Sequence, residues 1–155
     1  MTFRIITADE RISSAENKTS LAIFGPPGVG KTTLLNSLPA DETICLDLEA
    51  GMKSVQDWRG ASIPVRSFTD FRDLVVLIGG PDPAQHPQSW YGTERHAWLQ
   101  AQHRDSGIEA FLAARRIVFV DSITDLTRQV MAYARQQPEA FSDRTGKPDV
   151  RGAYG

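Results

Sequence analysis

A stretch near the start of the chain places the strongest constraint on its fold. Residues 25–33 read Gly-Pro-Pro-Gly-Val-Gly-Lys-Thr-Thr and match the loop pattern G-x-x-x-x-G-K-[ST] at every fixed position. The apolar residues 21–24 before it are typical of a buried strand, and residues 32–38 after it can continue as a helix that Pro39 ends. Because strand, glycine loop and helix follow in the order that the pattern requires, the stretch predicts a phosphate-binding loop.

The residue types of this loop indicate how it would hold an anion. Pro26 and Pro27 have no N–H group, so the donors to phosphate must be the main-chain amides of residues 28–32. Lys31 would contact the β- and γ-phosphates, and the Thr32 hydroxyl would bind Mg²⁺. The expected nucleotide-binding residues are Gly25, Gly28, Val29, Gly30, Lys31, Thr32 and Thr33. The alternative is a glycine-rich turn that only caps an ordinary helix.

Length and composition narrow the class of protein. At 155 residues the chain has the length of one domain, and its formal charge of −2 does not favour a generally basic nucleic-acid binder. Cys45 is the only cysteine and lies in an apolar run, which predicts a buried thiol and no disulfide framework. No apolar run approaches the length of a membrane helix, and the first residues are not typical of a signal peptide. We therefore expect a cytoplasmic protein without a membrane partner.

The alternation of strand-like and helix-like segments predicts an α/β fold with a mainly parallel sheet. We expect strands at residues 20–24, 43–47, 62–65 and 117–120, and a short one at 3–6. Pro64 suggests that the strand at 62–65 lies at an edge of the sheet. We expect helices at residues 67–78, 91–104, 106–115 and 123–136. The whole chain, 1–155, would form one nucleotide-binding domain, with a lead-in at 1–19, a core at 20–137 and a polar loop at 138–155.

Asp121 directly follows the most strand-like run of the chain, residues 117–120. A carboxylate at the end of a buried strand downstream of a phosphate loop matches the second motif of nucleotide-hydrolysing proteins, whose Asp orders Mg²⁺, usually through water. The alternative is that Asp121 or Ser122 only caps the next helix, because Ser122 and Asp125 have capping spacing. Both can hold, with Ser122 as the cap and Asp121 directed toward the metal.

With these features in view, the sequence resembles the RecA-like P-loop ATPases, and within them the AAA-family ATP-binding proteins of phages and prophages. The resemblance extends over nearly the whole chain. Its segments are IFGPPGVGKTTLL, TICLDLEAGMKSVQDW, IVFVDSITDL and QPEAFSDRTGKPDVRGAYG, of which the first is generic and the second and last are more particular. The resemblance implies a three-layer P-loop NTPase fold, ATP and Mg²⁺ as ligands, and ATP hydrolysis in phage DNA recombination or replication.

The resemblance also implies a catalytic glutamate just beyond the strand that follows the phosphate-loop helix. In RecA-like enzymes this glutamate polarises the attacking water, and Glu49 matches its position. The reaction needs such an acceptor, while Lys31 and Mg²⁺ stabilise the charge that develops on the phosphate. The catalytic residues would then be Glu49 and Lys31. Alternatively, Glu49 is a surface acid in a glycine turn.

The chain departs from the RecA-like pattern after Asp121. RecA-like domains continue with further strands, one of which lies between the Asp-bearing strand and the phosphate-loop strand. Only a helix and a loop follow Asp121 here. We therefore expect the sequence to be the front portion of a longer family member, with an α/β fold incomplete at its C-terminal end. The strands at 20–24 and 117–120 should not be hydrogen-bonded neighbours.

Two other functions stay open. One is a non-hydrolysing nucleotide-binding module in which ATP controls shape or assembly, and the other is a small-molecule kinase, although an arginine-rich lid pattern is absent. Partners implied by the resemblance are single-stranded DNA, phage recombination or replication proteins, and a second copy of the chain. The polar loop favours a solvated segment or a subunit contact over a DNA groove, because acids at 143 and 149 dilute the charges of Arg144, Lys147 and Arg151.

Overall fold

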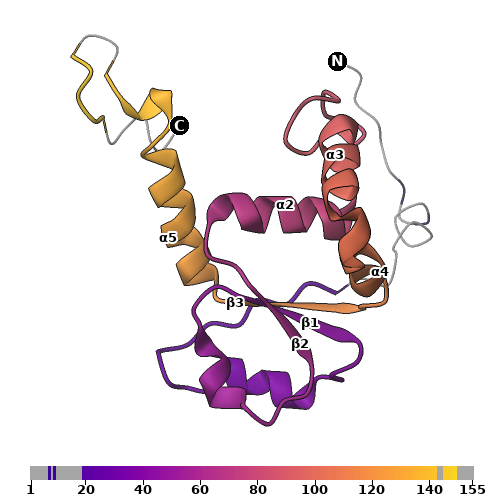
Figure 1. Ribbon diagram of the computed structural model, residues 1–155. Helices are drawn as coiled ribbons and strands as arrows, with labels where there is room; N and C mark the ends of the chain where they lie inside the picture. Colours follow the sequence, from indigo (N-terminus) through magenta and orange to yellow (C-terminus); the bar gives the residue numbers. More distant parts are fainter. Residues whose placement is uncertain (1–6, 8, 10–18, 143–144, 150–155) are drawn as a thin grey trace. The chain divides into compact units, whose positions relative to one another are not determined.

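The computed structural model describes residues 7, 9, 19–142 and 145–149 of the chain (Figure 1). These residues divide into two compact units with the boundary between Lys31 and Thr32, and each is described by itself. The first unit carries the glycine loop, and the second carries the sheet and its helices. The strand expected at residues 3–6 lies outside the described residues, as do residues 143–144 and 150–155 of the polar loop. Within the described part of the chain, no helix combines the length and the apolar composition that a membrane crossing requires.

Three parallel strands form the sheet of the second unit. They are β1 (Thr43–Asp47), β2 (Ala61–Pro64) and β3 (Ile117–Asp121). The order β2-β1-β3 places β1 in the middle, and all five of its residues are buried. Pro64 ends the edge strand β2, as its missing ladder donor indicated. The predicted α/β fold with a parallel sheet is therefore confirmed.

Helices connect the strands and cover the sheet. The α-helices are α2 (Phe68–Gly79), α3 (Thr93–His103), α4 (Ile108–Ala113) and α5 (Ile123–Ala134). The 3₁₀-helices are η1 (Thr32–Ser37), η2 (Gly51–Val55), η3 (Arg104–Ser106) and η4 (Pro138–Ala140). The four predicted α-helices are confirmed; α2 is shifted by one residue, and α3, α4 and α5 are shorter than predicted. Ser67 caps α2 by accepting a hydrogen bond from the amide of Asp70 (3.1 Å). The segment after the glycine loop is helical as predicted, but it winds as a 3₁₀-helix.

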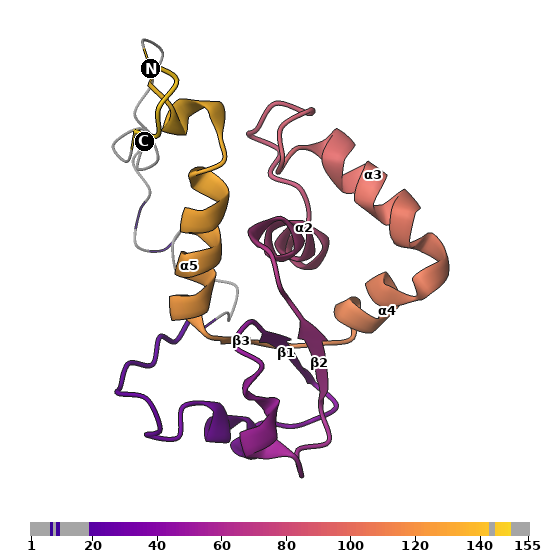
Figure 2. The same cartoon turned by 60° about the vertical axis from the view of Figure 1, so that its left-hand side comes forward.

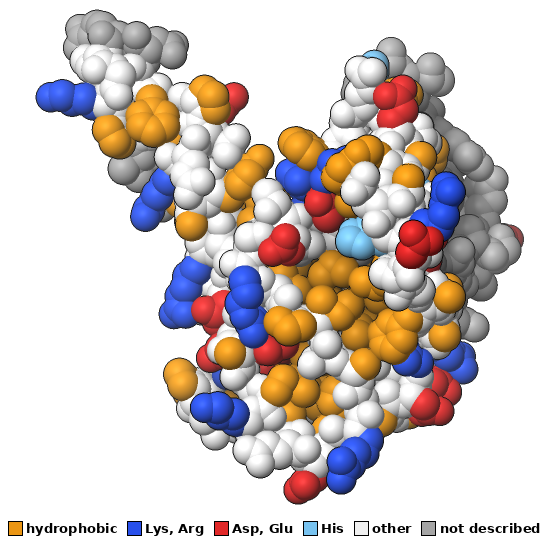
Figure 3. Space-filling model, viewed as in Figure 1, with side chains coloured by type: hydrophobic (Ala, Val, Ile, Leu, Met, Phe, Trp, Pro, Cys, Tyr) orange, Lys and Arg blue, Asp and Glu red, His pale blue; other side chains and the backbone are white. Residues whose placement is uncertain are grey.

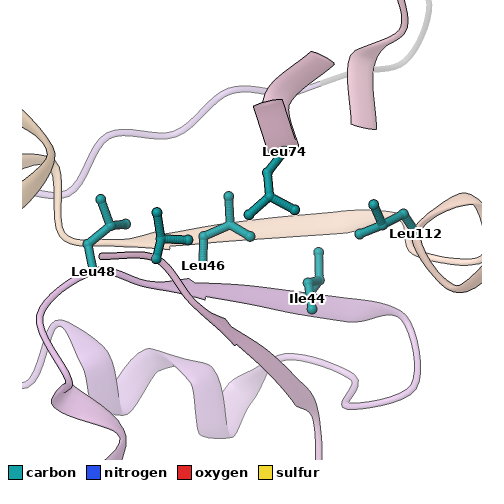
Figure 4. Close-up of a cluster of buried hydrophobic side chains, with 6 residues drawn as sticks. Ile44, Leu46, Leu48, Leu74 and Leu112 are labelled. Atoms are coloured by element: carbon teal, nitrogen blue, oxygen red, sulfur yellow. The ribbon is translucent and has the colours of Figure 1, made fainter. Parts of the chain in front are cut away.

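The side chains of β1 alternate between the two faces of the sheet, as the two-residue period of a strand requires. Ile44 and Leu46 are in the cluster that includes Leu74 of α2 and Leu112 of α4 (Figure 4). On the other face, Cys45 belongs to a second buried cluster, with side chains from η1 and η2. The two views agree that α2 and the pair η1 and η2 lie on opposite sides of the sheet (Figures 1 and 2). The second unit thus has the three layers that the resemblance implied.

The outer layer on the α2 side leaves a hollow between α2, α3 and α4. Leu77 and Ile78 from α2 line it together with Leu112 and Ala113 from α4. In the space-filling view, apolar side chains gather in the middle of this face (Figure 3). Near the N-terminus of α3, the guanidinium of Arg95 lies 2.7 Å from the carboxylate of Asp73 and so connects α3 to α2.

The expected strand at residues 20–24 is wrong for this structure. Residues 20–24 adopt no strand, and the side chains of Leu21 and Phe24 are 80% and 88% exposed. An apolar segment becomes a strand only where a neighbouring strand satisfies its main-chain groups, and no described strand pairs with it. Among the described strands, β3 pairs with β1. Residues 20–24 and 117–120 belong to different units, so the expectation that they are not hydrogen-bonded neighbours stays a prediction.

Candidate functional site

The glycine loop of the first unit has the backbone conformation that its sequence predicts. Gly28 and Gly30 both have positive φ, 77° and 93°, which side chains disfavour. Gly25 is required for another reason, because a Cβ at this position would lie 2.9 Å from Cγ1 of Val29. The loop is exposed through Val29, and residues 30–32 are partly buried. A loop of this kind can bring its backbone close to an anion.

Lys31 folds back over the loop that precedes it. Its Nζ donates hydrogen bonds to the carbonyl oxygens of Gly25 (2.9 Å) and Pro26 (3.0 Å). The ammonium group has three donors, so these two carbonyls do not exhaust its capacity. The lysine charge is therefore held at the start of the loop by the loop's own main chain.

Thr32 and Asp121 meet in the second unit, although they lie 89 positions apart in sequence. The Thr32 hydroxyl, on the first residue of η1, donates to Oδ2 of Asp121 at 2.7 Å. Asp121 is the last residue of β3 and is buried, with 4% of its surface exposed. A hydroxyl and a carboxylate are hard oxygen donors of the kind that Mg²⁺ prefers, and Mg²⁺ usually takes its other ligands from water and phosphate. The two residues fit a magnesium ion, and no group of three or more His, Cys, Asp or Glu in the described residues is arranged to hold a metal by itself.

The turn after β1 lies against Asp121. The amides of Leu48 and Glu49 donate to the carbonyl oxygen of Asp121, at 2.7 and 3.2 Å. Gly51 comes close to the same residue, since a Cβ there would lie 3.1 Å from Oδ2 of Asp121 and 3.7 Å from the Thr32 hydroxyl. The structure therefore brings the main chain of Glu49 next to Asp121, while the Glu49 side chain is exposed.

The two alternatives for the end of β3 are compatible. Ser122 is the N-cap of α5, and its hydroxyl oxygen accepts a hydrogen bond from the amide of Asp125 at 3.4 Å. The peptide bond between Asp121 and Ser122 is cis. Because Ser122 caps the helix, the Asp121 carboxylate is available to accept the hydrogen bond from the Thr32 hydroxyl. Thr33, by contrast, is exposed on η1.

Asp47 is a residue of this region to which the sequence analysis assigned no role. It is the last residue of β1, 5% exposed, and it lies directly opposite Asp121 in the parallel register. Its Oδ1 accepts a hydrogen bond from the amide of Gly51 (3.1 Å), and its Oδ2 lies 3.3 Å from Nη2 of Arg66. An acid at the end of a buried strand was the available signal for Asp47, whereas Arg66, in a loop after β2, had none.

The carboxylates of Asp47 and Asp121 also affect the pKa of Cys45, a buried residue of β1. Burial, together with the negative charges of Asp121 and Asp47, raises the pKa of Cys45 to about 12. The thiol is therefore protonated at neutral pH. Asp47 and Asp121 thus lie side by side at the carboxyl ends of β1 and β3, where Arg66 pairs with Asp47.

A family model described as an AAA domain matches residues 17–155, a range that includes the glycine loop, Glu49 and Asp121. Comparison with curated proteins and with solved structures finds no match. The match confirms the resemblance to P-loop ATPases of the AAA type, while the phage context stays a prediction. The chain belongs to the AAA domain family of nucleotide-binding, ATPase-type proteins.

Proposed function

We propose that the chain binds ATP with Mg²⁺ and hydrolyses it to ADP and phosphate. The observation that carries the proposal is the 2.7 Å hydrogen bond between Thr32 and Asp121. It joins the last fixed position of the loop pattern to the acid at the end of β3, the two positions that P-loop proteins use for their metal. Membership of the AAA domain family supports the nucleotide-binding part of the proposal.

All residues of the predicted set except Thr33 have a role in this proposal. The amides of residues 28–32 bind phosphate oxygens, and Lys31 exchanges its contacts with the loop carbonyls for the β- and γ-phosphates. Gly25, Gly28 and Gly30 keep the backbone accessible to the anion. Thr32 and Asp121 would hold Mg²⁺, Asp121 through water. When bound, this ion would neutralise part of the charge on the phosphates.

Glu49 is the proposed general base. The hydrogen bonds from the amides of Leu48 and Glu49 to Asp121 support this role, because they keep the turn that carries Glu49 beside the proposed metal ligands. In the reaction, the oxygen of a water molecule forms a bond to the γ-phosphorus as the bond to the bridging oxygen breaks. The proton of that water passes to the Glu49 carboxylate, and ADP and phosphate are released.

The wider setting of the proposal comes from the resemblance. In this setting, the chain is a single RecA-like domain of a cytoplasmic phage or prophage protein that acts in DNA recombination or replication. Single-stranded DNA, recombination or replication proteins and a second copy of the chain are the proposed partners. Stimulation of ATP turnover by single-stranded DNA would support this setting.

A second candidate is a module that binds ATP without hydrolysing it. The exposed side chain of Glu49 favours this candidate, since a general base needs a fixed position beside the attacking water. In that case ATP would control assembly or partner binding. The two candidates share the binding site and differ only in turnover.

The test compares Thr32→Val with Thr127→Val in Mg-ATP binding and turnover. Both variants remove the hydroxyl of a β-branched residue, but Thr127 lies on α5 and donates its hydroxyl to the carbonyl oxygen of Ile123. We expect Thr32→Val to lower turnover at limiting Mg²⁺ about 10-fold or more, and Thr127→Val to behave like the parent chain.

The outcomes separate the candidates. Failure of the parent chain to bind Mg-ATP in a calorimetric titration would overturn both. Binding without release of phosphate would favour the non-hydrolysing module. Equal magnesium dependence in the parent and in Thr32→Val would remove Thr32 and Asp121 from the metal site.

A further inference from the structure

Arg66 makes three contacts at the carboxyl ends of β1 and β2. Its Nη1 donates to the carbonyl oxygens of Asp47 and of Val65, the latter at 3.2 Å. Its Nη2 lies 3.3 Å from Oδ2 of Asp47. The planar guanidinium thus binds the main chain and the carboxylate of one residue at once, which the single ammonium of a lysine does not reproduce.

Asp47 connects Arg66 to the turn that carries Glu49, because its side chain contacts both. Its side chain is 7% exposed, and a buried carboxylate needs partners for its oxygens. One oxygen faces Arg66, and the other accepts the hydrogen bond from the amide of Gly51. Residues 48–51 are therefore tied back to the end of their own strand by the Asp47 side chain.

The turn is also strained, so it needs such ties. Ala50 has φ 59° and ψ 35°, the left-handed conformation that is unfavourable for a residue with a Cβ. Such a conformation persists where the surroundings determine it. On one side the amides of Leu48 and Glu49 donate to the carbonyl oxygen of Asp121, and on the other side Asp47 holds Gly51. Glu49 is thus attached through its own amide, and Gly51 is attached two residues later.

We propose that Arg66 is a positioning residue for Glu49, acting through Asp47. The inference rests on the proposed hydrolysis of ATP and adds a residue that no loop or strand motif includes. Arg66 is itself half exposed, so its ion pair with Asp47 is screened by solvent and adds little to stability. Its effect is on the geometry of the turn, and therefore on turnover more than on nucleotide affinity.

The kinetic test uses Arg66→Gln, with Arg116→Gln as the matched control. Arg116 is an exposed arginine at the opposite, amino end of the strands, where its guanidinium lies 3.8 Å from Glu42. We expect Arg66→Gln to lower kcat about 10-fold and to change KM for Mg-ATP by less than about 3-fold. Arg116→Gln should leave both at the values of the parent chain.

A double-mutant cycle with Glu49→Gln tests the route of the effect. If Arg66 acts by placing the Glu49 carboxylate, Arg66→Gln should cause no further loss of kcat once that carboxylate is replaced. An undiminished 10-fold loss in the Glu49→Gln background would overturn the proposal, because Arg66 would then act by another route.

Amide exchange of Gly51 reports on the turn without any reaction. We expect exchange about 10-fold faster in Arg66→Gln than in the parent chain or in Arg116→Gln. Unchanged exchange at Gly51 would overturn the proposal, as would a kcat equal to that of the parent. Absence of ATP turnover in the parent chain is a different result, since it overturns the proposed hydrolysis and the positioning role in it together.

Discussion

Lys31 is the residue whose removal should weaken nucleotide binding most. In the structure its ammonium donates hydrogen bonds to two carbonyl oxygens of its own loop, and in the proposed complex it exchanges them for phosphate oxygens. Losing a charge-assisted contact of this kind should cost about 2–4 kcal/mol of binding free energy in Lys31→Ala. Calorimetric titration with Mg-ATP measures the loss, and Lys147→Ala, which removes an exposed lysine, is the control. Unchanged affinity in Lys31→Ala would show that the glycine loop does not bind phosphate.

Cys45 makes stability depend on pH in the alkaline range. Burial, together with the charges of Asp121 and Asp47, raises the pKa of its thiol in the folded chain from 9.0 to about 12. Between these values the unfolded chain loses the thiol proton and the folded chain keeps it, so the unfolding free energy falls as pH rises. Below about pH 9 the contribution is fully present.

Urea unfolding of the parent chain and of Cys45→Val from pH 7 to about 10.5 checks this dependence. The variant has no thiol to ionise, so its unfolding free energy should fall less steeply above about pH 9. Parallel curves for the two chains would mean that the thiol ionises equally well in the folded state. Both chains contain the same tyrosines and lysines, so the difference between the curves isolates Cys45.

Strand β1 and residues 20–24 offer a test at the level of whole elements. Leu46 of β1 is 1% exposed in the core cluster, and Leu46→Ala should lower the unfolding free energy by about 2–5 kcal/mol. Leu21, 80% exposed, is the matched control, and Leu21→Ala should change it by less than about 0.5 kcal/mol. Urea unfolding measures both. A loss of more than about 2 kcal/mol in Leu21→Ala would mean that residues 20–24 are buried in solution.

Most elements of the sheet and its helices follow from local sequence patterns. The buried run of β1 and the capping serines of α2 and α5 are visible in the sequence, and the structure places an element at each. These signals are reliable because a cap or an apolar run acts on the residues next to it. Residues 20–24 are the exception, since an equally apolar run forms no strand when no neighbouring strand pairs with it.

For the molecule as a whole, the glycine loop and the acid after β3 were sufficient to predict a P-loop ATPase, and the family match agrees with them. The loop pattern specifies its own conformation, because glycine permits the positive φ of residues 28 and 30 and proline restricts the loop entry. The identities of Thr32, Glu49 and Asp121 as candidates were likewise evident from their spacing to strands and loop.

The contacts between residues distant in sequence could not be predicted from local patterns and are known only from the tertiary structure. The sheet order β2-β1-β3 sets Asp47 opposite Asp121, and the end of β2 brings Arg66 to Asp47 across 19 positions of sequence. No local pattern encodes such a meeting, because it depends on which strands pair and in what register. The sequence therefore predicted the candidates Thr32, Glu49 and Asp121. Arg66, which we propose positions the turn of Glu49, could be identified only from the structure, because its contact with Asp47 depends on the pairing of the strands.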